Sequence, residues 1–427
     1  MKTVAFITLG CKVNQYETNA MIQKLIEGGY KIVEHHEKAD IYIVNTCTVT
    51  NMSDRKSRQM IRKVKEINHQ AKIIAVGCYV EVAKNEVEKM KEIDLTLGNS
   101  EKVDIVKYCD NLLQDIKKDE NNKKNEFSEF GTITYTEKTR AVIKIQDGCD
   151  RFCSYCIIPY ARGRVRSRNP QNVISEITQI SKKGIKEVVL TGIHIASYGK
   201  DFDEKYELID LLEEINKIDG IQRIRLGSIE PLLITNEFIQ RLSKLEKICE
   251  HFHLSLQSGC DETLKRMNRR YTTTQFKEIV GIIRKAYKNA NLTTDIIVGF
   301  PQETEEEFKK TFEFLKEIKF YKMHIFKYSP RKGTLAEKMQ GQILPQIKEE
   351  RSRKLIELSD KNEEEYNKKY VGNEVEVLWE EEKQGIYKGH TKNYILVEQQ
   401  KESAKQKENT IENVEIVEAR DHYIIAK

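Results

Sequence analysis

The sequence predicts an α/β protein in three parts: an N-terminal open parallel sheet with helices, a central incomplete (β/α)6 barrel of TIM type, and a small C-terminal all-β barrel of OB type. Three observations predict this architecture. Two series of short apolar runs alternate with segments of helical spacing, a polar stretch separates the two series, and short alternating strands follow them. We place the boundaries at 1–112, 113–134 for a linker, 135–365 and 366–427.

The N-terminal part contains four apolar runs separated by helical segments. Strands that alternate with helices pair in parallel, so their carboxyl ends share one edge of the sheet, where ligands bind. Cys11, Cys47 and Cys78 each lie at or just beyond the end of one run, so we expect the three thiols to meet. Free cysteines are also common in cores, but the shared position favours a metal-ligand set. The runs are Val4–Leu9, Ile41–Val44, Ile73–Val76 and Leu95–Leu97.

The linker and the central part follow. Asp115–Asn125 is polar, charged and without period, which predicts a linker. From about Tyr135 a second alternation begins, and six strand–helix units of this length suit an incomplete barrel whose chemistry belongs at the carboxyl ends of its strands. The six strand candidates are Ala141–Ile145, Glu187–Leu190, Arg223–Leu226, Phe252–Leu256, Asp295–Val298 and Lys322–Phe326.

The first of these strands leads into three thiols within eight residues, Cys149, Cys153 and Cys156. Cysteine thiolates are the usual ligands of iron–sulfur clusters and zinc. A four-iron cube needs four ligands and this loop offers three, so one iron would stay open for a substrate. A zinc site completed by a distant histidine, or three unrelated thiols, are the alternatives.

The cysteine spacing, with Tyr155 just before the last cysteine, resembles the signature of radical S-adenosylmethionine (SAM) enzymes. The continuation 157–168 narrows the resemblance to the methylthiotransferases of that group, and residues 366–427 resemble their RNA-associated TRAM domain. The resemblance implies two [4Fe-4S] clusters, held by Cys149, Cys153 and Cys156 and by Cys11, Cys47 and Cys78. It also implies two SAM molecules. One methylates a cluster-bound sulfur, and the other is cleaved to a radical that abstracts a hydrogen atom from a C–H bond.

Small and polar residues follow the other barrel strands and let a cofactor approach the backbone. Any one of them alone could simply form the turn between a strand and the next helix. Their shared position after all these strands favours a binding site. Glu230 and Gln257 are our first candidates for polar contacts to SAM. The candidate cofactor-binding residues are Tyr155, Gly192, His194, Ser228, Glu230, Gln257, Ser258 and Tyr328.

Two short motifs concern the substrate. Leu9–Glu17 and Thr191–Gly199 look like the methylthiotransferases that act on N6-threonylcarbamoyladenosine at tRNA position 37, where the methylthio group is inserted at adenine C2. The isopentenyladenosine type usually reads Gly-Cys-Gln-Met-Asn at the first cysteine. That type, and the type that modifies an aspartate of a ribosomal protein, are the alternatives within the family.

Basic residues lie beside the proposed clusters, although the net charge is only +5. A charge run is usually a solvated face, but this placement leads us to expect phosphate contacts. Residues 366–427 carry ten basic and twelve acidic residues and form no electrostatic footprint for RNA by themselves. Arg162 is expected to meet either the SAM carboxylate or a phosphate. The expected RNA contacts are Arg162, Arg164, Arg166, Arg168 and Arg269.

The expected partners are a tRNA anticodon loop and an electron donor such as flavodoxin or ferredoxin, with the enzyme a monomer. No run of eighteen apolar residues occurs, so no membrane span is expected. Nine cysteines in a chain rich in lysine and glutamate indicate reduced thiols in the cytoplasm. A non-catalytic iron–sulfur protein that binds RNA or senses redox state is the alternative of another class, but it gives no reason for two sets of three thiols.

Overall fold

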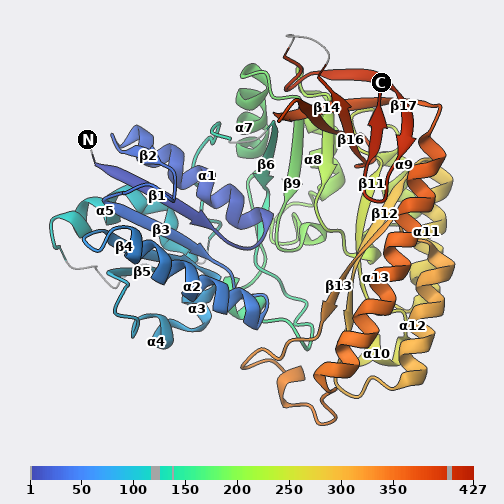
Figure 1. Ribbon diagram of the computed structural model, residues 1–427, viewed down its shortest axis with the longest axis horizontal. Coiled ribbons are helices and arrows are strands. Elements are labelled where there is room, and N and C mark those ends of the chain that lie inside the picture. Colours follow the sequence, from blue (N-terminus) through green and yellow to red (C-terminus); the bar gives the residue numbers. More distant parts are fainter. Residues whose placement is uncertain (1, 117–125, 137–138, 402–405) are drawn as a thin grey trace.

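The computed structural model describes residues 2–116, 126–136, 139–401 and 406–427, and the three predicted units are visible in Figure 1. The N-terminal unit lies beside the central barrel, and the C-terminal barrel sits at one end of it. No helix among the described residues is both long and apolar enough to cross a bilayer. The predicted fold class is confirmed.

The N-terminal unit is a five-stranded parallel sheet in the order β2-β1-β3-β4-β5. Its strands are buried on both faces, with Val4 packed on the side of α1 and α5 and Ala5 on the side of α2 and α3. Sequence reasoning missed β2, a three-residue edge strand. The elements are β1 (Thr3–Thr8), α1 (Lys12–Glu27), β2 (Lys31–Val33), β3 (Ile41–Thr46), α2 (Asn51–Ile67), β4 (Lys72–Gly77), α3 (Cys78–Val82), α4 (Lys84–Val87), β5 (Leu95–Leu97) and α5 (Ile105–Leu113).

The second half of the predicted linker is packed against the protein. Phe130 and Ile133 are buried in the core of the N-terminal unit, against the side chains of α1. Glu129 forms an ion pair with Arg168 of the central unit at 2.6 Å. Residues 117–125 of that linker lie outside the described residues. Residues 129–133 are therefore packed against the folded units, because Phe130 and Ile133 complete a core and Glu129 pairs with Arg168.

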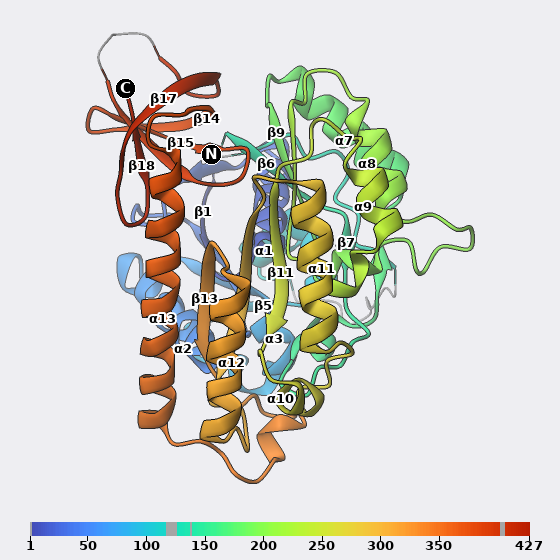
Figure 2. The ribbon, with the colours of Figure 1, turned by 90° about the vertical axis from the view of Figure 1, so that its right-hand side faces the viewer.

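The central unit contains the six predicted parallel strands in sequence order. They form two three-stranded sheets, β6-β9-β10 and β11-β12-β13, joined by parallel bridges from Ile224 to Ile248 and from Ile229 to Leu254. Helices cover the outer face (Figure 2). The strands are β6 (Arg140–Lys144), β9 (Glu187–Thr191), β10 (Arg223–Leu226), β11 (His251–Gln257), β12 (Asn291–Val298) and β13 (Lys322–Lys327), and the outer helices are α7 (Pro170–Lys182), α8 (Leu208–Asn216), α9 (Asn236–Leu242), α11 (Thr273–Ala286), α12 (Glu305–Ile318) and α13 (Pro345–Asn367).

Shorter elements surround the end of the barrel at which its strands finish. The pair β7 (Gln146–Asp147) and β8 (Arg166–Ser167) is antiparallel and brackets the cysteine loop. The helices α6 (Ile158–Arg162) and α10 (Asp261–Arg266) follow the cysteine loop and β11. The α6 helix packs against α3 of the N-terminal unit. This contact brings the carboxyl ends of the two parallel sheets together.

The C-terminal unit is a closed five-stranded barrel, as predicted, in the order β14-β15-β16-β18-β17. Its core is built around the fully buried Trp379. It covers the amino ends of the central strands, because Arg223 pairs with Glu376 and Arg140 pairs with Glu380. The strands are β14 (Glu374–Lys383), β15 (Ile386–Thr391), β16 (Leu396–Gln400), β17 (Ile411–Ala419) and β18 (Ile424–Ala426).

Candidate active site

Cys149, Cys153 and Cys156, here called the loop set, lie in one segment between β7 and α6. The segment is fixed by backbone hydrogen bonds: Cys149 N donates to Gly163 O, Cys156 N to Cys153 O and Ser154 N to Met267 O. It begins at Gly148, whose φ is +71° and where an added Cβ would lie 1.8 Å from Arg164 O. Only glycine tolerates both the dihedral and the contact. The loop is therefore held by backbone hydrogen bonds within its own segment and by one to the distant Met267.

The surroundings of the loop set are polar on one side and apolar on the other. Arg269 donates to Cys153 Sγ at 3.4 Å and pairs with Glu230 at 2.7 Å. Tyr155 is packed edge-on against Phe300. Burial raises the pKa of the Cys156 thiol to about 12. A metal ion deprotonates a coordinated thiol outright, so cluster assembly would overcome this cost.

Cys11, Cys47 and Cys78, here called the strand-end set, follow β1, β3 and β4 at the expected edge of the sheet. Cys11 is exposed, whereas Cys47 and Cys78 are buried. Gly10 has a φ of +104°, and a Cβ there would lie 2.9 Å from Cys47 Sγ. The chain can pass this close to the second thiol only without a side chain at position 10. Three segments far apart in sequence thus meet at one place.

A buried arginine joins the two sets. Arg162 ends α6, six residues after Cys156, and its Nε donates to Cys78 Sγ at 3.2 Å. Its Nη1 donates to Glu17 at 2.8 Å and to Asp147 at 3.2 Å. The side chain is fully buried. Arg162 therefore links the loop that carries the first set to a sulfur of the second.

The group around Arg162 has an excess of positive charge. Lys144 pairs with both Glu17 and Asp147, Lys102 pairs with Glu17 and Arg166 with Asp147, so with Arg162 four cations meet two carboxylates. The cations hold the pKa of Asp147 at about 2 and that of Glu17 well below its usual value, against the effect of burial. Burial raises the pKa of the Cys78 thiol, and the positive charges of Arg162 and Lys102 oppose this rise. This charge balance suits a metal ligand at that position.

The spacing of the sulfurs tests which inorganic group fits. A tetrahedral zinc ion with Zn–S bonds of about 2.3 Å places its sulfurs about 3.8 Å apart. Across the described ranges, the groups of three His, Cys, Asp or Glu ligand atoms within 4.8 Å of one another contain no cysteine. In neither cysteine set do the three sulfurs of the described chain lie within 4.8 Å of one another, which is wider than the spacing around one zinc ion. Thiolates around the larger iron–sulfur cluster tolerate a wider spacing.

The next strand ends place His194 and Glu230 near the loop set. His194 Nε2 lies 3.7 Å from Glu230 Oε2 and makes no hydrogen bond within the described chain. Gly192 lies against the side chain of Gln146. The Gln146 side chain accepts a hydrogen bond from His194 N and donates one to Gly148 O. Gln146 thus fixes both the histidine and the start of the cysteine loop. Sequence reasoning missed it because a single glutamine beside a strand carries no pattern.

The remaining candidate cofactor residues differ in their accessibility. Ser228 is exposed, but Ser258 is buried and lies 3.3 Å from the Thr311 hydroxyl. Gln257 has a φ of +73° at the end of β11. Tyr328 is buried beside Phe300, and among the residues placed here its hydroxyl has no hydrogen-bond partner. Of the four, only Ser228 offers its side chain freely to solvent.

Two of the five expected RNA contacts, Arg162 and Arg168, are buried, and Arg168 is held by ion pairs to Glu129 and Glu176. Both guanidinium groups are paired with buried carboxylates. Arg269 is occupied by Glu230 and Cys153, as described above. The exposed Arg164 pairs only with Asp150 at the surface, and Arg166 is partly exposed.

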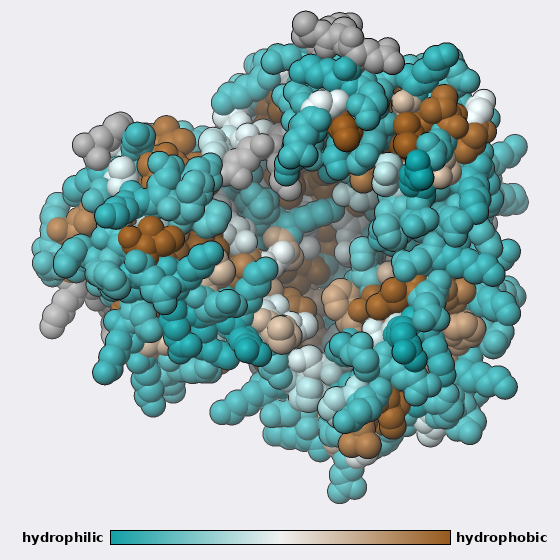
Figure 3. All heavy atoms as spheres, viewed as in Figure 1, coloured by the Kyte–Doolittle hydropathy of each residue, from teal (hydrophilic) through white to brown (hydrophobic). Residues whose placement is uncertain are grey.

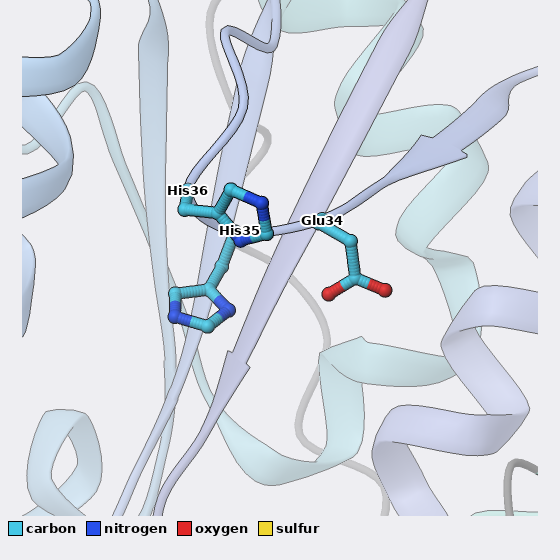
Figure 4. Close-up of side chains that lie close together, drawn as sticks. All are labelled: Glu34, His35 and His36. Carbon is cyan, nitrogen blue, oxygen red and sulfur yellow. The ribbon is translucent and has the colours of Figure 1, made fainter. Parts of the chain in front are cut away.

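A cluster of a different kind lies after β2. Glu34, His35 and His36 have ligand atoms within 4.8 Å of one another (Figure 4). All three are exposed and adjacent in sequence, and the two imidazoles meet edge to face. An exposed run of neighbouring polar residues is common without an ion. We assign it no function.

The comparisons with known proteins agree with this geometry. The family described as "Radical SAM superfamily" matches residues 143–315, and the one described as "Uncharacterized protein family UPF0004" matches residues 3–98. Threonylcarbamoyladenosine tRNA methylthiotransferase MtaB of Bacillus subtilis (strain 168) is 41% identical over 93% of this chain and 90% of its own length. A tRNA-2-methylthio-N(6)-dimethylallyladenosine synthase of Clostridium botulinum (strain Loch Maree / Type A3) is 35% identical over 87% of this chain and 85% of its own length.

Among solved structures, the radical S-adenosylmethionine methyltransferase TsrM from Kitasatospora setae, with cobalamin and a [4Fe-4S] cluster bound, has a TM-score of 0.56. It is 14% identical and covers 77% of each chain, so this likeness concerns the fold alone. The relatives above cover nearly the whole chain at much higher identity. Together with the matched radical SAM domain, they show that the chain belongs to the radical SAM methylthiotransferase family, whose enzymes use SAM and a [4Fe-4S] cluster.

Proposed function

We propose that this enzyme inserts a methylthio group at C2 of N6-threonylcarbamoyladenosine, at position 37 next to the anticodon of tRNA, using two SAM molecules and two [4Fe-4S] clusters. The observation that carries the proposal is the pair of three-cysteine sets joined through Arg162. The substrate is supported by the relatives, since those at 41% identity carry the threonylcarbamoyladenosine name. The bound groups would supply hydrogen abstraction and the sulfur atom.

The chain would supply ligation, aim and exclusion of water. The loop set would hold the cluster that binds SAM, and the strand-end set would hold a second cluster. Arg269 would keep Glu230 aimed at the SAM site. Arg162 would fix the distance between the clusters, because it is tied to both units at once. We propose the remaining SAM contacts among Tyr155, Gly192, His194, Ser228, Gln257, Ser258 and Tyr328.

The partners follow from this assignment. We propose the anticodon loop of a tRNA as substrate, an electron donor such as flavodoxin or ferredoxin, a monomeric enzyme and a cytoplasmic location. Arg164 and Arg166 remain our proposed phosphate contacts. We also propose 1–112, 135–365 and 366–427 as the domain limits.

The test uses the anaerobically reconstituted enzyme with SAM, a reductant and two synthetic anticodon stem-loops. One carries N6-threonylcarbamoyladenosine and the other N6-isopentenyladenosine. Nucleoside mass spectrometry should find the methylthio product only from the first. A product from the second alone would assign the enzyme to the other activity, which the 35% relative represents. Absence of 5′-deoxyadenosine in both reactions would favour the non-catalytic alternative.

A further inference from the structure

A cavity of about 540 Å³ lies where the central barrel meets α1 and the C-terminal barrel. Its wall includes Lys12 of α1, Ser228 after β10, and His253, Asp295 and His324 on β11, β12 and β13. The ring of Tyr394, from the C-terminal barrel, also lines it. Its volume is within the range of about 300–1,000 Å³ that small-molecule sites occupy. Figure 3 shows the surface hollowed between the N-terminal unit and the central barrel, which both contribute residues to this wall.

Two residues of the cavity wall lie close in sequence to residues of, or in contact with, the cysteine sets. Lys12 directly follows Cys11 of the strand-end set. Ser228 stands two residues before Glu230, which Arg269 ties to Cys153 of the loop set. A base bound in this cavity would therefore be flanked by residues that adjoin both sets. This location suits the target base of the substrate, which must be held in place during the reaction.

Most charged groups of the cavity already have partners. Lys322 pairs with Glu363 at 2.9 Å, and His253 with Asp295 at 3.1 Å. Lys12 is different: within the described parts of the chain, its ammonium group makes no hydrogen bond and no ion pair, and its side chain is exposed to the cavity. An ammonium without a counter-ion in a walled cavity attracts an anion.

Two guanidinium groups lie next to the Tyr394 ring that lines the cavity, and each is paired with a carboxylate. The guanidinium groups of Arg140 and Arg225 lie 5.1 Å and 4.6 Å from the centre of the Tyr394 ring, at the end of the cavity that this ring covers. They are held there by Glu187, which pairs with Arg225 at 2.7 Å. Ser228, whose hydroxyl has no partner within the described residues, adds a neutral donor. Among the described residues, the cavity wall thus offers the unpaired Lys12 ammonium and the Ser228 hydroxyl.

From this arrangement we propose that the cavity is a carboxylate-recognition site and that Lys12 pairs with the free carboxylate of the amino-acid substituent on the target adenosine. This inference rests on the proposed function, because the threonylcarbamoyl group is the substituent that carries a carboxylate. An uncharged alkyl substituent would remove water from the ammonium without replacing it, which is unfavourable. Lys12 would therefore favour the substituent that carries a carboxylate and disfavour an uncharged alkyl substituent.

The test compares two anticodon stem-loops that differ only in charge, one with the threonylcarbamoyl carboxylate free and one with it as the methyl ester. Dissociation constants are measured by fluorescence anisotropy and kcat and KM by mass spectrometry, using reconstituted wild type, Lys12→Gln and Lys12→Arg. Lys24→Gln is the matched control, since Lys24 lies on the same helix and not in the cavity. Iron content and melting temperature verify that each variant is intact.

Wild type should prefer the acid at least about tenfold, as expected for a charged hydrogen bond. Lys12→Gln should bind the acid as weakly as the ester, and the effect should appear as a higher KM for the acid. Lys12→Arg and Lys24→Gln should keep the preference for the acid. Equal use of acid and ester by wild type, or an acid preference that survives in Lys12→Gln, would overturn the inference and leave the proposed function standing. Turnover of the isopentenyladenosine stem-loop alone would overturn both.

Discussion

The loop set and the strand-end set each present three thiols, but they bring them together in different ways. The loop set occupies one short segment, fixed mostly by local backbone hydrogen bonds and by one to Met267. The strand-end set gathers three segments that only the parallel sheet brings together. A local motif therefore depends on loop geometry, and a dispersed one depends on the integrity of the sheet and on what is packed against it. Changes at each should have different consequences.

The largest expected contrast is between Cys153→Ala and Cys47→Ala. Cys153→Ala removes a ligand of the proposed SAM-binding cluster and should abolish formation of 5′-deoxyadenosine. Cys47→Ala removes a ligand of the other cluster, so 5′-deoxyadenosine should still form while the methylthio product disappears. Chromatography of single reactions measures both products. Equal loss of 5′-deoxyadenosine in the two variants would show that the sets do not divide the chemistry.

Arg162→Gln should weaken the contact between the N-terminal and central units more than it disturbs the fold of either unit. Removing one partner of a buried ion pair costs about 3–5 kcal/mol, because Glu17 and Asp147 lose a counter-ion. Iron bound at the strand-end set should fall more than iron at the loop set, since Arg162 contacts Cys78. Denaturant unfolding and spectroscopy of each cluster measure these effects. Arg241→Gln, on an exposed pair, is the control and should cost about 1 kcal/mol or less.

Gly148→Ala should damage the loop set alone. The new Cβ would collide with Arg164 O in a backbone conformation that alanine rarely adopts. We expect a loss of about 1–3 kcal/mol in stability and a lower iron content at this set. Gly131→Ala is the control, because its φ is also positive but nothing lies within 4 Å. Equal effects of the two variants would mean that strain, and not the contact, matters.

The smallest effect concerns acid stability. The pKa of Asp147 is about 2 in the folded protein against 3.8 for a free aspartate, so its contribution is present above pH 4 and is lost as pH falls toward 2. The contribution is about 2 kcal/mol. Asp147→Asn should therefore reduce the fall in unfolding free energy between pH 5 and pH 3, measured by urea denaturation. An unchanged pH profile would contradict the depressed pKa.

The sequence predicted the six barrel strands and the C-terminal barrel because hydrophobic period and turn residues are local signals. It also placed Cys11, Cys47 and Cys78 at one edge, since parallel topology follows from strand–helix alternation. It did not predict that Arg162 and Arg168 are buried. Their partners, Glu17 and Glu129, are far away in the chain, and an arginine run looks the same whether it faces solvent or a buried carboxylate. The packing of Phe130 was missed for a similar reason, because the polar residues around it resemble a linker.

Iron and sulfide analysis of the anaerobically reconstituted enzyme tests the central claim most directly. Wild type should contain about eight irons and eight sulfides per chain, that is, two four-iron clusters. Replacing all three cysteines of either set by alanine should leave about four of each. A wild-type content of about four irons, unchanged when Cys11, Cys47 and Cys78 are replaced together, would contradict the account.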